Sequence, residues 1–410
     1  MQKNATLSLQ SYAVNATIKL PSSKSESNRA LILNHLSNKL FQVNNVSSAD
    51  DTQLLIKLLG SIGKESTLDC GPAGTTFRFL TAMLAFTGGN YTLTGSDRMK
   101  ERPIKDLIDA LLLLGANINY LEKEGFPPIT IQGTQPSSNI TRVSVANSSQ
   151  YLSSLLLIAS SLPKGLQIET VGEMGSAPYI DMTIQLLNKA GIEVIRNNTT
   201  FHIAKQDFKT TTFNVEADWS GASYWFSRVA LSDNGSMLLL GLKPDSLQGD
   251  QVVKDIYQKL GVTSTYTTEG LHINKTHQPE KNFNWDFTHC PDLAQTVLAT
   301  CAVFGVTLTC CGLKSLRIKE TDRILAMQTE LAKIGAQLST LNNETFILRP
   351  SDKIPSNKVF INTYHDHRMA MAFAPLAALV PKLEIEDKMV VSKSYPSFWD
   401  DLTLTGITVT

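Results

Sequence analysis

The chain has 410 residues and a mass of 45.0 kDa, with 42% hydrophobic and 18% charged residues, which is typical of a globular protein long enough for two domains. The 37 Lys and Arg residues balance the 37 Asp and Glu residues, so there is no general positive field to attract nucleic acid or an acidic membrane. Any binding of anions must therefore be local.

The first predicted element with chemical character is a helix that follows Pro21–Ser23. Lys24 and Ser25 fall at its opening, and Arg29 follows about one turn later, before the apolar residues Ala30–Leu33. A helix N-terminus offers free N–H groups and the positive end of a dipole, so these side chains suit an anionic ligand. A serine-rich N-cap with incidental cations fits the same pattern.

A glycine-rich turn at Gly71–Thr76 joins a short predicted strand, Ser66–Cys70, to the next helix. Gly74 allows a backbone N–H group to approach a phosphate closely. The turn lacks the Lys-Ser/Thr ending of a Walker A loop, so it does not predict a site for a nucleoside triphosphate and magnesium. Arg102, in Glu101–Pro103, adds a cation before a further predicted helix.

Two more predicted helices open on neutral hydrogen-bonding side chains. Ser148, Ser149 and Gln150 precede one apolar stretch, and Ser176 precedes another that includes Ile180. Hydroxyl and amide groups can hold a phosphate without adding charge. Ordinary capping, for which serine is a preferred residue, remains open for both segments.

The C-terminal half places carboxylates among cations at predicted helix starts. Asp292 opens an apolar helix, where it can cap or can accept a proton from a substrate hydroxyl. Within Leu316–Ile324, we expect Lys319, Glu320 and Arg323 to share one helix start, with the two cations four apart on one face. Glu320 is then a candidate acid and base, although a solvated helix end with ordinary ion pairs is the alternative.

Arg368 lies at another predicted helix entrance, and Lys393 precedes the last predicted helix. His365 and His367 could suggest a metal, but their i, i+2 spacing separates the imidazoles on a helix, and no distant partner cluster accompanies them. We therefore expect no metal here. If these scattered cationic helix ends meet at a common cleft, they form a positive cavity for two small anions.

A recurring pattern links the predicted elements: an amphipathic helix that ends at a glycine and leads into a strand. About six occurrences, mostly spaced by roughly 70 residues, indicate repeated strand and helix units of the α+β (α/β repeat) type. Coincidence remains open because this succession is common. The expected C-cap glycines are Gly63, Gly115, Gly191, Gly261, Gly335 and Gly406.

The sequence also predicts where the protein resides and in which state. The N-terminal region lacks the apolar core of a secretion signal, and no apolar run can span a bilayer, so we expect a cytoplasmic protein. No unpaired apolar stripe calls for a partner, so we expect a monomer. The cysteines are odd in number and lack paired C-x-x-C spacing, so we expect structural or incidental thiols at Cys70, Cys290, Cys301, Cys310 and Cys311.

The order of these motifs along nearly the whole chain resembles that of the 5-enolpyruvylshikimate-3-phosphate synthase family. In chain order the motifs are Lys24-Ser25-x-x-x-Arg29, Gly74-Thr75-x-x-Arg78, Glu101-Arg102-Pro103, Ser148-Ser149-Gln150, Ser176-x-Pro178-Tyr179-Ile180-Asp181, Pro291-Asp292, Lys319-Glu320-Thr321-Asp322-Arg323 and Asp366-His367-Arg368. Each motif is moderate evidence, but their order is highly specific.

The resemblance implies two globular domains, each of three βαβαββ-type units, in an inverse α/β-barrel-like fold. It implies a discontinuous domain of residues 1–20 and 217–410, an inserted domain of residues 21–216 that binds most of shikimate 3-phosphate, and an active site in the cleft between them. The implied reaction transfers the enolpyruvyl group of phosphoenolpyruvate to the 5-hydroxyl of shikimate 3-phosphate and releases phosphate. It serves chorismate and aromatic amino acid biosynthesis and requires no metal or organic cofactor.

The resemblance also implies roles for individual residues. Asp292 would be the base for the 5-hydroxyl, and Glu320, assisted by Lys24, would protonate the methylene carbon and later remove a proton. The residues implied to bind shikimate 3-phosphate are Lys24, Ser25, Arg29, Ser148, Ser149, Gln150, Ser176, Asp292 and Lys319. The residues implied to bind phosphoenolpyruvate are Lys24, Gly74, Arg102, Gln150, Arg323, Arg368 and Lys393.

Three positions depart from the family pattern: Pro72, Ser315 and His365 stand where Asn is common, and we assign them no role. Pro72 also removes one backbone N–H group from the phosphate turn, so the contact there must depend on Gly74. Because Gly74 leaves space beside phosphoenolpyruvate, we expect glyphosate to inhibit the enzyme by occupying it.

Two alternatives differ from this interpretation. The related enzyme that transfers enolpyruvyl to UDP-N-acetylglucosamine would be expected to carry a loop cysteine in an Arg-Pro segment, and Met99–Pro103 has none. A non-catalytic anion-binding protein of the same fold would gain nothing from the carboxylates of Asp292 and Glu320.

Overall fold

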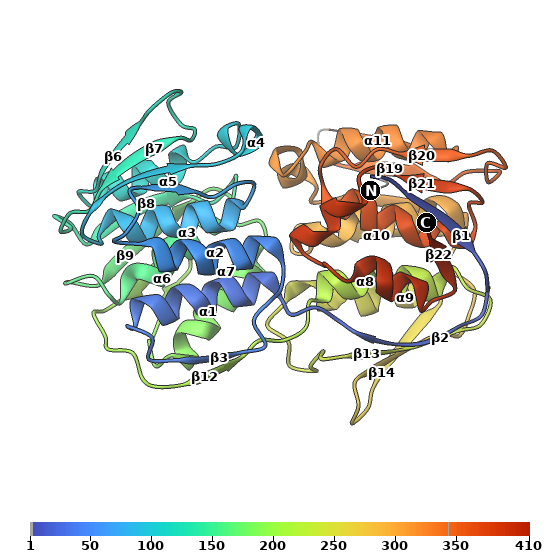
Figure 1. Cartoon of the computed structure of the whole chain (residues 1–410), viewed down its shortest axis with the longest axis horizontal. Coiled ribbons are helices and arrows are strands. Elements are labelled where there is room, and N and C mark those ends of the chain that lie inside the picture. The colour runs from blue at the N-terminus through green and yellow to red at the C-terminus, as the bar shows by residue number, and fades with distance from the viewer. Residues whose placement is uncertain (1–2, 343) are drawn as a thin grey trace. The chain divides into compact units, whose positions relative to one another are not determined.

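The computed structural model describes residues 3–342 and 344–410, and its chain forms two compact units. Unit 1 consists of Met1–Ser22 and Glu216–Thr410, and unit 2 consists of Ser23–Val215. The chain therefore leaves unit 1 once and returns to it once. In Figure 1, the inserted unit 2 runs from blue to green, and both chain ends belong to unit 1.

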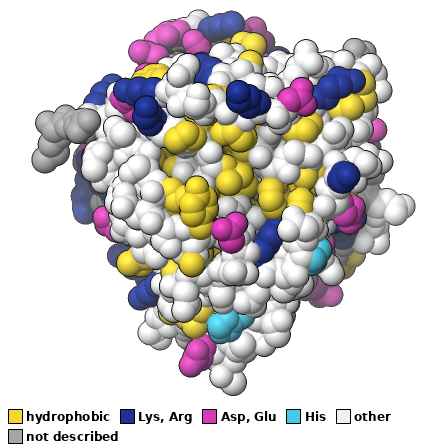
Figure 2. All heavy atoms as spheres, turned by 90° about the vertical axis from the view of Figure 1, so that its right-hand side faces the viewer, with side chains coloured by type: hydrophobic (Ala, Val, Ile, Leu, Met, Phe, Trp, Pro, Cys, Tyr) yellow, Lys and Arg dark blue, Asp and Glu magenta, His cyan; other side chains and the backbone are white. Residues whose placement is uncertain are grey.

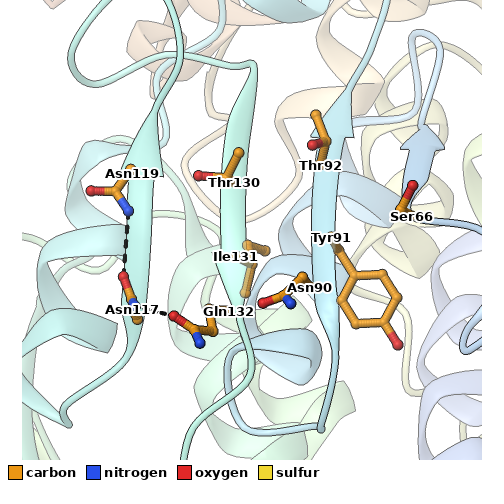
Figure 3. Close-up of a pocket in the computed structure, with 9 residues that line it drawn as sticks. All are labelled: Ser66, Asn90, Tyr91, Thr92, Asn117, Asn119, Thr130, Ile131 and Gln132. Carbon is orange, nitrogen blue, oxygen red and sulfur yellow. Dashed lines mark hydrogen bonds between the residues drawn. The ribbon is translucent and has the colours of Figure 1, made fainter.

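One arrangement of strands recurs in five four-stranded sheets of the described residues. In the sheet of Figure 3, β4 (Thr67–Asp69) pairs in parallel with β5 (Asn90–Thr94), β5 pairs antiparallel with β7 (Ile129–Gln132), and β7 pairs antiparallel with β6 (Asn117–Tyr120). A parallel pair requires a crossover, which α3 (Gly74–Ala85) supplies between β4 and β5. The predicted strand and helix repeat is confirmed as a βαβαββ succession.

Unit 2 contains two of these sheets, in the orders β4-β5-β7-β6 and β8-β9-β11-β10, and a third sheet in which its described residues supply only the parallel pair β3 and β12. The other elements of unit 2 are α1 (Lys24–Leu36), β3 (Gln42–Asn44), α2 (Asp50–Ser61), α4 (Asp97–Lys100), α5 (Lys105–Leu113), β8 (Ile140–Ser144), α6 (Ser149–Ala159), β9 (Leu166–Val171), α7 (Ala177–Lys189), β10 (Ile195–Asn197), β11 (Thr200–Ile203) and β12 (Thr212–Asn214).

Unit 1 contains the other three sheets, in the orders β2-β13-β15-β14, β16-β17-β19-β18 and β20-β21-β1-β22. The elements of the first sheet and its helices are β2 (Val14–Lys19), α8 (Trp219–Ala230), β13 (Gly235–Leu240), η1 (Gly249–Val252), α9 (Val253–Lys259), β14 (Val262–Tyr266) and β15 (Leu271–Lys275). Because β2 precedes unit 2 and its parallel partner β13 follows it, unit 2 is inserted into the crossover of this repeat.

The second repeat of unit 1 follows directly along the chain, and the third is completed by the N-terminal strand β1, which pairs with both β21 and β22. The elements are β1 (Ala5–Leu9), β16 (Asn282–Asp286), η2 (Pro291–Leu293), α10 (Ala294–Phe304), β17 (Thr307–Cys311), η3 (Lys314–Ile318), α11 (Arg323–Lys333), β18 (Gln337–Thr340), β19 (Phe346–Arg349), β20 (Val359–Ile361), α12 (His367–Phe373), η4 (Ala374–Ala378), β21 (Leu383–Ile385), η5 (Lys388–Lys393), α13 (Phe398–Thr403) and β22 (Ile407–Val409).

The crossover helices form the core of each unit. Every residue of α8 is buried, and α3, α6, α10 and α12 each have only one residue that is not. Helices that are apolar on all sides belong in an interior. In three of these helices the residue that is not buried lies in the first turn: Thr75, Gln150 and Arg368. The core helices therefore present polar side chains at their N-terminal ends.

The predicted C-cap glycines are confirmed. Each follows a helix and has a φ between 79° and 93°, in the left-handed region that favours glycine. These positions are Gly63, Gly115, Gly191, Gly261, Gly335 and Gly406.

The surface agrees with the balanced composition. In the described parts of the chain, no helix combines the length and apolar character needed to cross a membrane. Figure 2 shows one face on which cationic and anionic side chains alternate around hydrophobic ones, without a region of a single sign. The five cysteines are free thiols, and all but Cys311 are buried.

Glu216 anchors the return of the chain into unit 1. Its side chain accepts hydrogen bonds from Trp219 Nε1 (2.9 Å), Lys243 N (2.9 Å), Gln248 Nε2 (3.0 Å) and Ser246 Oγ (2.5 Å), and the residue is only 3% exposed. A buried carboxylate is tolerated when hydrogen bonds satisfy it. Glu216 therefore joins the crossing segment to two neighbouring loops.

Glu216→Ala should lower the free energy of unfolding of unit 1 by about 2–4 kcal/mol, because it leaves several buried donors without an acceptor. Urea unfolding followed by tryptophan fluorescence measures this, since all four tryptophans lie in unit 1. Glu280→Ala is the control, because this exposed carboxylate makes one surface ion pair, with Lys259. Equal stability of the two variants would contradict the anchoring role.

Candidate functional site

The predicted site residues form two clusters, one in each unit. We call them the unit 1 cluster and the unit 2 cluster. The unit 1 cluster consists of Asp292, Lys319, Glu320, Arg323, Arg368 and Lys393. The unit 2 cluster consists of Lys24, Ser25, Arg29, Gly74, Arg102, Ser148, Ser149, Gln150 and Ser176, placed at the starts of α1, α3, α6 and α7 and just after α4.

Asp292 lies in η2, directly before α10, between two guanidinium groups. One carboxylate oxygen accepts from Arg368 Nη2 (2.9 Å) and the other from Arg323 Nη1 (3.0 Å), and its side chain is 14% exposed. Burial raises the pKa of Asp292, but the charges of Arg368, Lys319 and Arg323 together outweigh burial and hold the pKa well below its usual range. Asp292 is therefore ionised at neutral pH.

Arg323 is the centre of the unit 1 cluster. Its guanidinium donates to Asp366 (2.7 Å), Glu320 (2.9 Å) and Asp292 (3.0 Å), and its side chain is only 2% exposed. Burial lowers the pKa of Arg323, whereas the three carboxylates raise it, and the net pKa lies above its usual range. Lys393, at the end of η5, adds a second cation 3.4 Å from Glu320. Cations and carboxylates thus alternate through the cluster.

The expectation that Lys319, Glu320 and Arg323 share a helix start is wrong. The helix α11 begins at Arg323. The side chain of Asp322 caps it by accepting hydrogen bonds from Ile324 N and Leu325 N, at 3.1 Å each. Lys319 instead follows the 3₁₀ helix η3 in an extended conformation. Lys319 and Arg323 therefore approach Asp292 through tertiary packing and not through helical spacing.

Three members of this region were not predicted as site residues: Asp366, Ser220 and Asp250. Asp366 is fully buried, caps α12 and binds Arg323. Asp250 accepts a short hydrogen bond from Ser220 Oγ. The same Ser220 oxygen lies 3.3 Å from Arg368 Nη2. Burial, reinforced by the charge of Asp292, raises the pKa of Asp250 to about 7. Asp366 belongs to the Asp366-His367-Arg368 motif, so the sequence offered a signal for it. Nothing in the local sequence of Asp250 distinguishes it from a surface aspartate.

Arg29 is the buried cation of the unit 2 cluster. Its guanidinium donates to Thr183 Oγ1 (2.7 Å), Ser153 Oγ (3.2 Å) and the carbonyl oxygens of Ser25 (3.0 Å) and Tyr179 (3.3 Å), all of them neutral. Burial lowers the pKa of Arg29 to about 10, so it remains charged at neutral pH. A buried guanidinium surrounded by neutral acceptors suits an anionic ligand.

Two arginine guanidinium groups pack closely against Gly74 at the start of α3. A Cβ atom at Gly74 would lie 2.5 Å from Arg102 Nη1 and 2.6 Å from Arg78 Nη1. Lys24, at the start of α1, pairs with Asp51 at 2.8 Å, an acidic partner that was not predicted. The cations of unit 2 therefore converge on the N-terminal ends of α1 and α3.

The serine-rich segments divide into two kinds. Ser148 caps α6 by accepting from Gln150 N, so ordinary capping holds for its hydroxyl, while Gln150 Nε2 donates to Thr75 Oγ1 (3.0 Å) and joins α6 to α3. Ser176 has a φ of 57° and its side chain makes no capping bond to α7. Capping therefore does not account for Ser176.

A pocket of about 290 Å³ lies elsewhere, on the outer face of the β4-β5-β7-β6 sheet (Figure 3). Its lining is uncharged and includes a row of amides in which Asn119 donates to Asn117 and Asn117 donates to Gln132. It includes no residue of the unit 2 cluster and no cation, so it does not suit an anionic substrate. Among the described residues, no group of His, Cys, Asp and Glu could hold a metal ion.

Comparison with known proteins identifies the family. A sequence profile described as EPSP synthase (3-phosphoshikimate 1-carboxyvinyltransferase) matches residues 10–67 and 64–402. A 3-phosphoshikimate 1-carboxyvinyltransferase of Bacteroides fragilis is 43% identical over 395 residues, which is 96% of each chain. One from Escherichia coli is 35% identical, covering 97% of this chain and 98% of the relative.

The solved structures agree in fold. An EPSP synthase structure from Acinetobacter baumannii superposes with a TM-score of 0.78 over 99% of this chain and 100% of that one, at 20% identity. This likeness confirms the two-domain α/β fold, and the sequence matches confirm the resemblance inferred from the order of the motifs. The chain belongs to the EPSP synthase (3-phosphoshikimate 1-carboxyvinyltransferase) family of transferases.

Proposed function

We propose that this protein transfers the enolpyruvyl group of phosphoenolpyruvate to the 5-hydroxyl of shikimate 3-phosphate and releases phosphate. The observation that carries the proposal is the ionised Asp292, which is held between Arg323 and Arg368. Glu320 pairs with the guanidinium group of Arg323 as well. Such a cluster offers cations for an anionic substrate and carboxylates for proton transfer. The proposal also includes a cytoplasmic monomer without a metal or organic cofactor.

The unit 2 cluster supplies most contacts to shikimate 3-phosphate in this proposal. The neutral surroundings of Arg29 support its binding to the shikimate carboxylate, together with Ser25. The serine hydroxyls of Ser149 and Ser176, with the helix start at Ser148, bind the phosphate. Gln150 and Lys24 contact the ring, and Asp292 and Lys319 of the unit 1 cluster complete the site.

Phosphoenolpyruvate carries a carboxylate and a phosphate, and the proposal assigns it to cations of both clusters. Arg102, beside the N–H group at Gly74, and Lys24 contribute from unit 2, with Gln150 as a neutral donor. Charge-assisted and bidentate bonds from guanidinium groups match both anionic groups of this substrate. The cations from unit 1 are Arg323, Arg368 and Lys393. The proposal requires both clusters to act on the same pair of substrates.

The resident charges also set the strength of the base. The charges of Arg368, Lys319 and Arg323 hold the pKa of Asp292 low, which makes it a weak base. An anion bound to Arg323 and Arg368 offsets part of their charge, which raises the pKa of Asp292 toward its usual range. Phosphoenolpyruvate thereby strengthens the base in the complex that reacts.

The proton transfers then follow in balance. Asp292 takes the proton of the 5-hydroxyl as the oxygen bonds to C2 of phosphoenolpyruvate, and Glu320, assisted by Lys24, donates a proton to the methylene carbon. In the second step Glu320 removes a proton from the resulting methyl group while the C2–O bond to phosphate breaks, and the proton held by Asp292 passes to the departing phosphate. The products are the enolpyruvyl ether and inorganic phosphate.

A phosphate-release assay tests the function. Purified protein should release phosphate from phosphoenolpyruvate only when shikimate 3-phosphate is present. In the control reaction, UDP-N-acetylglucosamine replaces shikimate 3-phosphate as the acceptor. Turnover with the nucleotide sugar and none with shikimate 3-phosphate would assign the chain to the related transferase, and anion binding without turnover would indicate a non-catalytic protein.

Asp292→Asn should lower kcat by about 10²- to 10⁴-fold, because it removes the base. The KM for phosphoenolpyruvate should not rise, since the substitution removes a carboxylate that competes with the substrate for Arg323 and Arg368. Steady-state kinetics with both substrates varied measures this. Asp286→Asn, in which the carboxylate accepts from Thr288 and from the Cys311 thiol and contacts neither arginine, should retain full activity. A variant with near-normal kcat excludes Asp292 as the base.

Gly74→Ala should weaken inhibition by glyphosate by about tenfold, a change equivalent to 1.4 kcal/mol. The added methyl group must displace the Arg102 guanidinium, 2.5 Å from the new Cβ, and fills space beside the substrate. Inhibition constants against phosphoenolpyruvate measure the effect. Gly60→Ala is the matched control, because a Cβ there meets nothing within 4 Å. An unchanged inhibition constant in Gly74→Ala counts against the shared space.

A further inference from the structure

The segment between β20 and α12 contains two consecutive residues in the left-handed region. Tyr364 has a φ of 53° and His365 a φ of 55°. This backbone is unfavourable for any residue with a Cβ atom, and a run of two is held only where surrounding contacts determine it. The turn therefore stores strain.

The strained turn leads directly into the unit 1 cluster. It closes through a hydrogen bond from Asp366 N to Thr363 O (2.9 Å), and the side chain of Asp366 then binds both Arg323 and the N–H group of Arg368 (2.9 Å). Arg368 in turn binds Asp292. The conformation of the turn thus sets the positions of both arginines around Asp292.

Glu330 of α11 holds the turn from behind. This fully buried residue accepts from Tyr364 Oη (2.7 Å), Asn362 N (3.0 Å) and Lys333 Nζ (2.6 Å). Burial and the bond to Glu330 raise the pKa of Tyr364 to about 12, so its hydroxyl remains a donor at neutral pH. A second carboxylate, Glu386, accepts from Thr363 N (3.0 Å).

The helix α11 links this support to the site. Arg323 and Glu330 are seven residues apart, which places them on one face of the helix, and both are buried. Arg323 binds Asp366 after the turn, whereas Glu330 binds Asn362 and Tyr364 before and within it. The helix and the turn are therefore joined at two points, and both points lie on the same face of α11.

We propose that Glu330 and Tyr364 are positioning residues for phosphoenolpyruvate: their hydrogen bond keeps the left-handed turn in the conformation that aligns Arg323 and Arg368. They act through Asp366 and not by touching the substrate. The expected effect on KM rests on the proposed function, because the proposed function says that phosphoenolpyruvate is the substrate that Arg323 and Arg368 bind.

Tyr364→Phe removes only the hydroxyl and should raise the KM for phosphoenolpyruvate roughly fivefold, the equivalent of one hydrogen bond, while leaving the KM for shikimate 3-phosphate unchanged. Tyr266→Phe is the matched control, because its hydroxyl donates to Lys243 O at a similar distance, 2.8 Å, away from the turn. Glu330→Gln, which keeps one acceptor, should be milder than Glu330→Ala. Equal rises in both KM values would indicate general destabilisation and overturn the proposal.

Relief of strain gives a test that a purely structural role would not pass. His365→Gly alone should be close to wild type, because glycine adopts the left-handed region freely. Combined with Tyr364→Phe, it should restore most of the lost affinity for phosphoenolpyruvate, since the turn then needs less support. Failure of this rescue would contradict the proposal.

A measurement independent of activity separates this inference from the proposed function. Amide exchange at Asp366 and Arg368, whose N–H groups are bonded within the turn, should be faster in Tyr364→Phe than in wild type or Tyr266→Phe. If the wild type shows no turnover, the proposed function fails while the exchange result still decides the role of the turn. Unchanged exchange in Tyr364→Phe overturns the positioning role.

Discussion

The burial of the Arg323 guanidinium among three carboxylates is the interaction on which the unit 1 cluster depends. A buried charge is costly unless it is paired and hydrogen-bonded, and here Asp292, Glu320 and Asp366 satisfy it. These carboxylates come from η2, from the N-cap of α12 and from the segment before α11. One cation therefore binds three separate parts of the chain to each other.

The two clusters solve the problem of a buried arginine in different ways. Arg323 is surrounded by resident carboxylates, whereas Arg29 of unit 2 has four neutral acceptors. In a site that already holds its counter-ions, a substrate anion can replace a resident carboxylate as the partner of the arginine. This replacement changes the pKa of the displaced carboxylate. A site with neutral acceptors gains most when an anion arrives. In the proposed reaction, the first kind of site tunes a base and the second kind holds an acceptor substrate.

Much of the fold was predictable because it depends on local chemistry. The C-cap glycines were found because a left-handed residue after a helix favours glycine, and the spacing of these glycines indicated the repeat. The helix starts were found because polar and cationic residues interrupt apolar stretches there. Asp250, in contrast, is distinguished only by burial beside Ser220, and Asp51 only by its contact with Lys24, so local sequence could not single them out.

By itself the sequence determined the repeated βαβαββ units, the family and the positions of the arginines and lysines that gather at helix starts. It misplaced Lys319 because helical spacing was applied to a segment in which α11 begins only at Arg323. The tertiary structure alone decided which carboxylate meets which cation, the pKa values that follow, and the left-handed turn at Tyr364 and His365. These features depend on side chains far apart in the chain, such as Asp292 and Arg368, which are separated by 76 residues, and only packing of the core helices brings such groups within hydrogen-bonding distance.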